Sequence, residues 1–89
     1  MKAIITVIGS DRPGIIAKIS ACLAEININI LDITQTTMQG LFTMITLADI
    51  ANCTVEFGEL VARAEAAGSE IGVQVTVQRE DIFNSMHRI

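Results

Sequence analysis

Apolar residues recur along the chain with two periods, every second residue in some segments and every third or fourth in others. The alternating segments, rich in β-branched residues, are residues 2–8, 28–38, 41–50 and 71–78. The segments with helical spacing are residues 13–26 and 54–67. Alternation is typical of strands, and the wider spacing is typical of amphipathic helices. The predicted order of elements is therefore strand, helix, strand, strand, helix, strand.

The first predicted strand is apolar on both of its faces. Ala3, Ile5 and Val7 share one face, and Ile4 and Ile8 share the other. A strand with two apolar faces belongs in the middle of a sheet rather than at its edge. The last strand alternates apolar with polar residues throughout, so one of its faces is expected to meet water.

Residues with special backbone preferences set the expected ends of the helices. Pro13 is favoured in the first turn of a helix, because its missing N–H would have no partner there. Asn27 and Gly68 are expected to take left-handed conformations that end the two helices. Thr54 is expected to cap the start of the second helix through its hydroxyl group.

A tight turn at Gln39-Gly40 joins the two middle strands into an antiparallel hairpin. We therefore expect an α+β fold, a ferredoxin-like βαββαβ sandwich in which two helices cover one face of a four-stranded antiparallel sheet. No helix is predicted on the other face of the sheet. One domain is expected over residues 1–80, followed by a short C-terminal helical extension over residues 81–89.

The C-terminal extension has an apolar pattern of its own. Asp81 is placed to cap a short helix whose apolar face comprises Ile82, Phe83, Met86 and Ile89. Burial of one large side chain contributes about 1.5–3 kcal/mol, so we expect this helix to pack across the sheet or against a second subunit. Truncation after Arg79 should then lower the stability or change the oligomeric state.

Composition narrows the functions that such a fold can carry. The chain has 89 residues, of which 51% are hydrophobic, and a formal net charge of −4. This hydrophobic fraction is high for such a small domain, and one face of the predicted sheet has no helix to cover it. Both features predict a homodimer. The six basic residues are scattered and the only aromatic residues are three phenylalanines, so direct nucleic-acid binding is not expected. No signal peptide opens the chain and no apolar run could span a membrane, which predicts a cytoplasmic protein.

The sequence offers little for catalysis or metal binding. Cys22 and Cys53 are far apart, His87 is the only histidine, and no CxxC pair is present. We therefore expect no metal, no cofactor and no catalytic residues. An RNA-recognition module needs aromatic residues on its central strands, which here offer only Phe42. An acylphosphatase needs a glycine-rich phosphate cradle, and Pro13 removes one amide from the first loop.

Two stretches of the chain resemble the ACT domain, a regulatory module that senses amino acids in many metabolic enzymes. They are residues 11–16 (DRPGII), between the first strand and helix, and residues 23–30 (LAEININI), which enter the second strand. ACT domains combine a D/N-x-P-G motif with an asparagine 15 residues after its glycine, the spacing of Gly14 and Asn29 here. The resemblance covers residues 1–80, and the length is similar to that of stand-alone bacterial and archaeal ACT proteins and, in outline, to the ACT domains of glycine cleavage repressors.

The resemblance implies a ligand-binding site between two subunits. In ACT domains that bind amino acids, the loop before the first helix meets an asparagine from the second strand of a neighbouring subunit. By position, one subunit would contribute Asp11, Pro13, Gly14 and Ile15, and the other would contribute Asn29. Unpaired N–H groups at the helix start would bind the ligand carboxylate, and Asp11 would accept hydrogen bonds from the ligand ammonium.

Two positions depart from the pattern of serine-binding relatives. Gly9 stands where those proteins often have histidine, and Asp11 stands where they commonly have an amide. An aspartate carboxylate does not donate to a ligand carboxylate, so the sequence does not identify the ligand. Simpler alternatives are that Asp11 only caps the helix and that Asn29 only forms turn or interface hydrogen bonds.

The sequence thus predicts a non-catalytic regulatory module that homodimerises, binds a small metabolite such as an amino acid at the subunit interface, and passes that state to a protein partner. One alternative is an ACT dimer that serves protein interactions without a ligand. The other, less favoured, is an acylphosphatase-like enzyme.

Overall fold

Four strands and two helices follow one another in the order that the hydrophobic pattern predicts. The computed structural model describes residues 1–81. The elements are β1 (Lys2–Ser10), α1 (Ile15–Glu25), β2 (Asn29–Met38), β3 (Leu41–Asp49), α2 (Phe57–Glu70) and β4 (Val73–Arg79). The ferredoxin-like βαββαβ architecture is confirmed. The helix predicted over residues 81–89 lies, apart from Asp81, outside the described residues.

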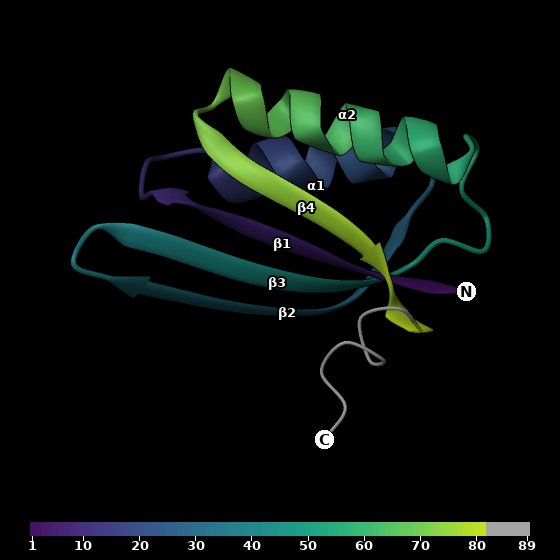
Figure 1. Cartoon of the computed structure of the whole chain (residues 1–89), viewed down its shortest axis with the longest axis horizontal. Coiled ribbons are helices and arrows are strands. Elements are labelled where there is room, and N and C mark those ends of the chain that lie inside the picture. Colours follow the sequence, from purple (N-terminus) through teal and green to yellow (C-terminus); the bar gives the residue numbers. More distant parts are fainter. Residues whose placement is uncertain (82–89) are drawn as a thin grey trace.

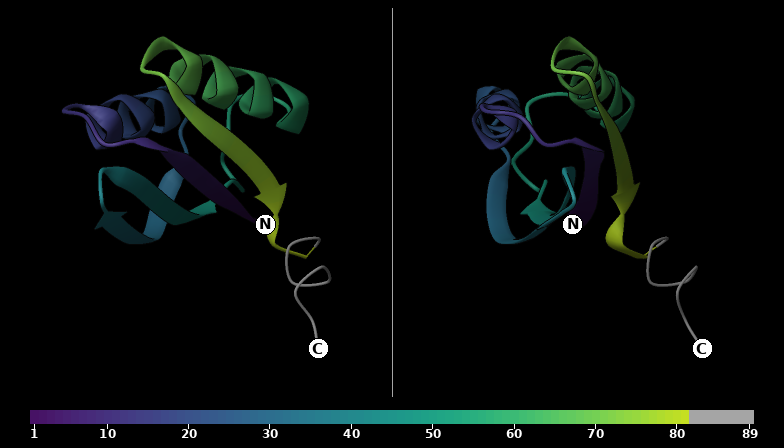
Figure 2. Two further views of the ribbon diagram at one scale, coloured as in Figure 1. Left: turned by 60° about the vertical axis from the view of Figure 1, so that its left-hand side comes forward. Right: turned by 90° about the vertical axis from the view of Figure 1, so that its left-hand side faces the viewer.

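β1 lies inside the sheet, as its two apolar faces predict. The strand order is β2-β3-β1-β4, and each strand is antiparallel to its neighbours. Both helices lie on the same face of the twisted sheet (Figure 1, Figure 2). No helix of the described chain covers the opposite face, and β2 and β4 form the two edges. Neither described helix is long and apolar enough to cross a membrane.

The core fills the space between the sheet and the helices. Alternate residues of β1, β3 and β4 are buried on this side. The largest fully buried side chains are Ile5, Val7, Ile19, Leu23, Ile26, Met44, Thr46 and Leu60. The edge strand β2 differs, because almost all of its residues are exposed. β2 is therefore the most accessible strand of the sheet.

α1 begins two residues later than the sequence predicts. Pro13 and Gly14 form a turn before the helix, and Gly14 is left-handed, with φ 89°. A residue with positive φ cannot continue a right-handed helix, so α1 starts at Ile15. Asn27 follows the helix in the predicted left-handed conformation, with φ 61°. The Asn27 side-chain amide also donates a hydrogen bond to the Asn52 carbonyl at 3.0 Å.

The predicted boundaries of α2 are wrong at both ends. The backbone N–H of Thr54 donates to the carbonyl of Ile26 at 3.0 Å, and the helix begins three residues after Thr54 without a side-chain cap. Gly68 lies buried inside α2 rather than at its end. The left-handed residue is Gly72, with φ 74°. Ile71 and Gly72 therefore form a turn, and β4 begins after them.

Replacing the buried Thr46 by valine should stabilise the fold. Thr46 is 1% exposed, and its hydroxyl group has no hydrogen-bond partner in the part of the chain that the structure describes. An unpaired buried hydroxyl group costs about 1–3 kcal/mol, so Thr46→Val should raise the free energy of unfolding by about 1–2 kcal/mol. Urea denaturation should show a higher midpoint with an unchanged slope.

The matched control for this substitution is Thr6→Val. Thr6 lies on the opposite face of the sheet and is only half-buried. The same change there should alter the free energy of unfolding by about 0.5 kcal/mol or less. Equal effects of the two substitutions would show that the Thr46 hydroxyl group carries no special cost.

Candidate ligand-binding site

An open hollow of about 310 Å³ lies where the loop between β1 and α1 meets the end of the β2–β3 hairpin. The loop and the start of α1 contribute Asp11, Arg12, Gly14, Ile15, Ile16 and Ala17. The hairpin contributes Gln35, Thr37 and Phe42. Pockets that bind small ligands begin at about 300 Å³, so the hollow has room for a small metabolite.

Two neighbouring turns hold the loop in place. The backbone N–H of Asp11 donates to the carbonyl of Gly40 at 2.8 Å, which fixes the loop to the hairpin turn. On the other side, the Arg12 guanidinium lies against Gly72, where an added Cβ atom would be 3.3 Å from Nη1. The loop is thus bound to the hairpin turn by a hydrogen bond and lies against the second turn through the side chain of Arg12.

The start of α1 presents unpaired backbone donors to this hollow. Because Gly14 is left-handed, the first hydrogen bond of the helix runs from the Lys18 N–H to the Gly14 carbonyl, at 2.9 Å. No described group accepts from the N–H groups of Ile15, Ile16 and Ala17. These groups and the positive end of the helix dipole favour an anion such as a carboxylate.

Apolar and neutral polar side chains complete the hollow. Ile15 and Phe42 are buried, with exposed fractions of 2% and 4%. Thr37 is the register partner of Phe42 and Gln35 that of Met44, so both polar side chains lie on the helix side of β2. Gln35 and Thr37 are exposed, and each can donate and accept hydrogen bonds.

Gln35 and Thr37 were not among the predicted site residues. A signal for them was present, because the Gln39-Gly40 turn fixes the register of the hairpin. Both turn residues have positive φ, 51° and 82°. Given this register, Thr37 must stand opposite Phe42, beside the loop that Gly40 holds.

The structure brings together some of the predicted site residues but not all. Asp11, Gly14 and Ile15 line the hollow, and Pro13 belongs to the same loop without lining it. The alternative that Asp11 caps α1 is wrong, because the start of this helix has no side-chain cap. Asn29 is exposed at the opposite end of β2, beyond the C-terminus of α1. One chain therefore does not contain the complete predicted site.

A second hollow, of about 220 Å³, lies between the outer surfaces of α1 and α2. Both of its basic groups are already paired, Lys18 with Glu70 and Arg63 with Glu59, and Glu25 adds a further negative charge. The hydrogen bond and charge of Glu70 raise the pKa of Lys18, and burial raises the pKa of the Cys22 thiol. Cys22 is thus protonated at neutral pH, which makes it a poor nucleophile.

This second hollow is less suited to an anionic group than the first, because both of its basic side chains already have acidic partners. The first hollow keeps its helix N–H donors unpaired. Across residues 1–81, no group of three or more histidine, cysteine, aspartate or glutamate side chains is arranged to hold a metal ion.

The sequence and the fold are both similar to those of known proteins. A family model described as ACT domain matches residues 2–78, a range that contains every candidate site residue. Over 88 residues the chain is 58% identical to a UPF0237 protein of Methanocaldococcus jannaschii, which covers 99% of this chain and 98% of that protein. Among solved structures, the ACT domain protein from Streptococcus pneumoniae aligns with a TM-score of 0.82 and 40% identity over 93% of each chain. The ligand-free regulatory subunit of aspartate kinase from Thermus thermophilus aligns with a TM-score of 0.66 and 28% identity, over 86% of this chain and 50% of that one.

Proposed function

This chain belongs to the ACT domain family, and we propose that it is a non-catalytic regulatory module that binds an amino acid between two identical subunits. The family is one of regulatory, ligand-binding modules. The observation that carries the proposal is the hollow at the start of α1, where backbone donors without partners lie beside the carboxylate of Asp11. Donors for an anion and an acceptor for a cation in one hollow suit a zwitterion.

An amino acid fits this arrangement through both of its charged groups. Its carboxylate would accept hydrogen bonds from the N–H groups of Gly14 and Ile15, where the helix dipole adds about 0.3–1 kcal/mol. Its ammonium group would donate to Asp11, a charge-assisted hydrogen bond that is stronger than a neutral one. Gly14, without a side chain, leaves room for the ligand backbone, since an added Cβ atom would meet nothing within 4 Å.

The edge strand β2 suggests how the second subunit completes the site. Edge strands present N–H and C=O groups that are ready to pair with another chain. Antiparallel pairing of two β2 strands about a two-fold axis at the strand centre would set Asn29 of one chain opposite Met38 of the other. Met38 precedes the turn in which Gly40 holds the Asp11 loop. This pairing would bring the first residues of β2 of one chain, Asn29 among them, close to the hairpin turn that holds the Asp11 loop of the other chain.

A thermal-shift screen over the twenty amino acids tests the proposal. A ligand that binds only the folded state must raise the melting temperature, by an amount that grows with its concentration relative to Kd. We expect at least one amino acid to do so. NMR titration with that amino acid should then shift the backbone resonances of residues 11–15 and Asn29. Shifts confined to the uncovered sheet face would contradict the proposed site.

The same measurements separate the two alternatives. An ACT dimer that serves only protein interactions would keep its two-chain mass and respond to no small molecule. An acylphosphatase-like enzyme would hydrolyse acyl phosphates, but Pro13 lacks an N–H for a phosphate cradle and Arg12 is directed to the Gly72 turn. We expect no such hydrolysis. We also propose a regulated protein partner, by analogy with the regulatory subunit of aspartate kinase. The proposed cytoplasmic location rests on the sequence pattern alone.

A further inference from the structure

β4 forms one edge of the sheet and lacks the features that usually protect an edge strand. It pairs with β1 alone, and no other described element lies beyond it (Figure 2). Bulges, prolines and charged side chains usually keep edge strands from pairing with another chain. The ladder between β1 and β4 has no bulge, and residues 73–78 include no proline and no charged residue. β2, the other edge, has a register shift between Ile30 and Asp32, so β4 is the more regular template for a further strand.

A hollow of about 370 Å³ borders this edge. Residues 73–76 of β4 form one side of the hollow, and Glu65 and Ser69 of α2 form the other. No residue of β1 contributes, so the hollow lies on the free side of β4. Domains that bind extended peptides as an added strand use main-chain hydrogen bonds for affinity and neighbouring pockets to select side chains. The β4 edge and this hollow provide both elements.

Main-chain groups of β4 are available for such pairing. In an antiparallel ladder, every second residue directs its N–H and C=O groups toward one neighbour, and the residues between them direct theirs the other way. β1 is the only neighbour of β4 in the described sheet. Turns and loops of residues 1–81 form no backbone hydrogen bond with residues 74–77. An added strand would therefore meet unpaired donors and acceptors along this stretch.

The side chains of β4 indicate the pattern of a matching strand. Val73 and Val75 lie on the helix side and are buried, whereas Gln74 and Thr76 are exposed on the other side. Cross-strand pairs of apolar residues, and of threonines, stabilise a sheet. A matching strand therefore has apolar residues on the helix side and neutral polar residues such as threonine on the other.

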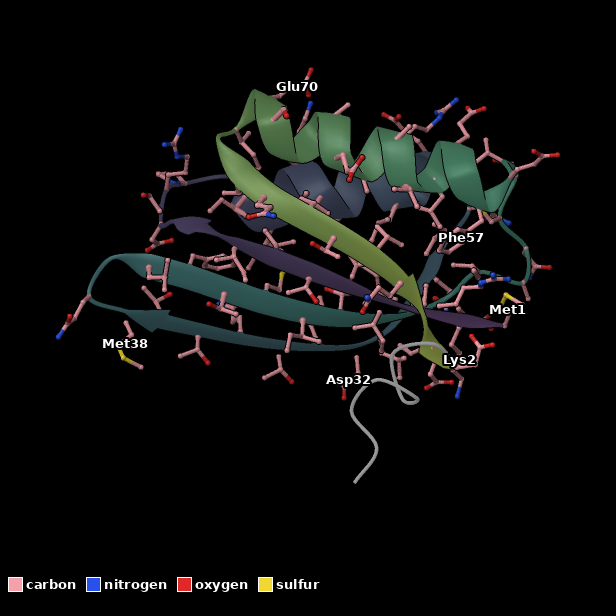
Figure 3. All side chains as sticks on the ribbon, in the orientation of Figure 1. Met1, Lys2, Asp32, Met38, Phe57 and Glu70 are labelled. Atoms are coloured by element: carbon pink, nitrogen blue, oxygen red, sulfur yellow. The ribbon has the colours of Figure 1, made fainter. Side chains whose placement is uncertain are left out.

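Glu65 adds a requirement for charge. Its carboxylate is exposed at the wall of the hollow and has no ion pair or hydrogen bond with any residue in the range 1–81. At the far end of β4, the Arg79 guanidinium lies over the Phe57 ring, 5.5 Å from its centroid. Figure 3 shows Phe57 at the start of α2, beside the end of β4. A basic residue of the added strand is therefore favoured at Glu65 and disfavoured at the Arg79 end.

We propose that β4 binds an extended segment of a partner protein as an added strand, with a basic side chain of that segment at Glu65 and apolar side chains beside it on the helix side. This partner is the regulated protein of the proposed function, so the inference rests on that proposal. The β2 pairing of two subunits leaves both β4 edges accessible. Arg12 of the ligand loop lies against Gly72, the residue before β4, so the candidate ligand site and the docking edge share one turn.

The peptide acetyl-Thr-Val-Thr-Lys-Thr-Val-Thr-amide tests the inference, because an extended chain places its valines and lysine on one face and its threonines on the other. NMR titration of the full-length protein with this peptide should shift the backbone resonances of residues 73–77 and of Glu65. A peptide with glutamate in place of lysine should bind about fivefold more weakly, because repulsion replaces attraction at Glu65.

Two N-methylated forms of the lysine peptide test the main-chain pairing. One is methylated at its threonines and the other at its valines and lysine, and only one of these patterns removes the N–H donors that face β4. One form should therefore lose binding, and the other should keep it.

A charge reversal on α2 tests the role of Glu65. Glu65→Arg should invert the preference, so that the glutamate peptide binds more tightly than the lysine peptide. The matched control is Glu25→Arg, an exposed residue of α1 that does not line the hollow. It changes the net charge by the same amount and should keep the preference for the lysine peptide.

Several outcomes would overturn the inference. Occupation of the edge by a second copy, or by the chain's own residues, would leave the lysine peptide unbound. Shifts confined to β2, equal binding of the two N-methylated peptides, or an unchanged preference in Glu65→Arg would contradict it as well. Failure of the proposed function would appear separately, as the absence of any response to amino acids, and would leave the peptide titrations as they are.

Discussion

Gly68→Ala should lower the free energy of unfolding by about 2–4 kcal/mol, although alanine is the better helix former. An added Cβ atom at position 68 would lie 2.5 Å from Cγ2 of Val75 and 2.8 Å from the carbonyl oxygen of Val73. The second contact is with backbone, so a rotamer change cannot relieve it. α2 would have to move away from β4, and the packing of Leu60 and Ala64 on the same buried stripe of the helix would loosen.

Gly58→Ala is the matched control for this substitution. Gly58 lies in the first turn of α2, and an added Cβ atom there would meet nothing within 4 Å. Alanine should stabilise the helix at this position by about 0.5–1 kcal/mol. Chemical denaturation of both variants should therefore give free-energy changes of opposite sign. Stabilisation by both substitutions would show that α2 and β4 are not in close contact at Gly68.

The position of Gly68 inside α2 could not be predicted from local sequence. A glycine near the end of a helical pattern is consistent both with a left-handed cap and with close packing inside the helix. Only the position of β4 decides between them, and that is tertiary information. The prediction for Thr54 was wrong because the helix begins only at Phe57. The segment before it is held by a tertiary contact, the hydrogen bond from the Thr54 N–H to the Ile26 carbonyl.

The fold itself was predictable because its signals are local and agree with one another. The two apolar faces of β1 place this strand inside the sheet, and the Gln39-Gly40 turn, with positive φ at both residues, fixes the hairpin. Apolar residues repeat every two residues in the strands and every 3.6 in the helices, and this order of elements is compatible with few topologies. Apolar faces, turn residues and periodicity all report on backbone geometry, so they predict the fold without any knowledge of the function.

The candidate site was only partly predictable. The motif of residues 11–16 pointed to the loop, and the structure places Asp11, Gly14 and Ile15 around one hollow. Pattern alone did not distinguish Gln35 and Thr37 from any other polar residues of an edge strand. Their role follows from the hairpin register and from the hydrogen bond that holds the loop on the turn. Asn29 remains a prediction, because its place in the site depends on a second chain.

Single substitutions at the two ends of the proposed site should each weaken amino-acid binding. Asn29→Ala should cost about 1–3 kcal/mol, or about 5- to 150-fold in Kd, by leaving a polar group of the ligand unpaired. Asp11→Asn should weaken amino acids more than it weakens simple carboxylates, because only the contact with the ammonium group changes its charge. Both variants should fold, since neither side chain has a hydrogen bond within the described residues.

Mixed dimers of these two variants should regain wild-type sites that neither variant has alone. In a dimer of one Asp11→Asn chain and one Asn29→Ala chain, one site carries both substitutions and the other carries neither. Refolding equal amounts of the two variants together should therefore restore wild-type affinity to about a quarter of all sites, as measured by isothermal titration calorimetry. The control is the double variant mixed with wild type. Its mixed dimers contain no intact site, so exchange of subunits should lower the intact sites from about a half to about a quarter of all sites. If Asn29 acted within its own chain, mixing the two single variants would restore no high-affinity sites. If Asn29 had no role, the Asn29→Ala variant alone would keep wild-type affinity. Either result would disprove the shared site.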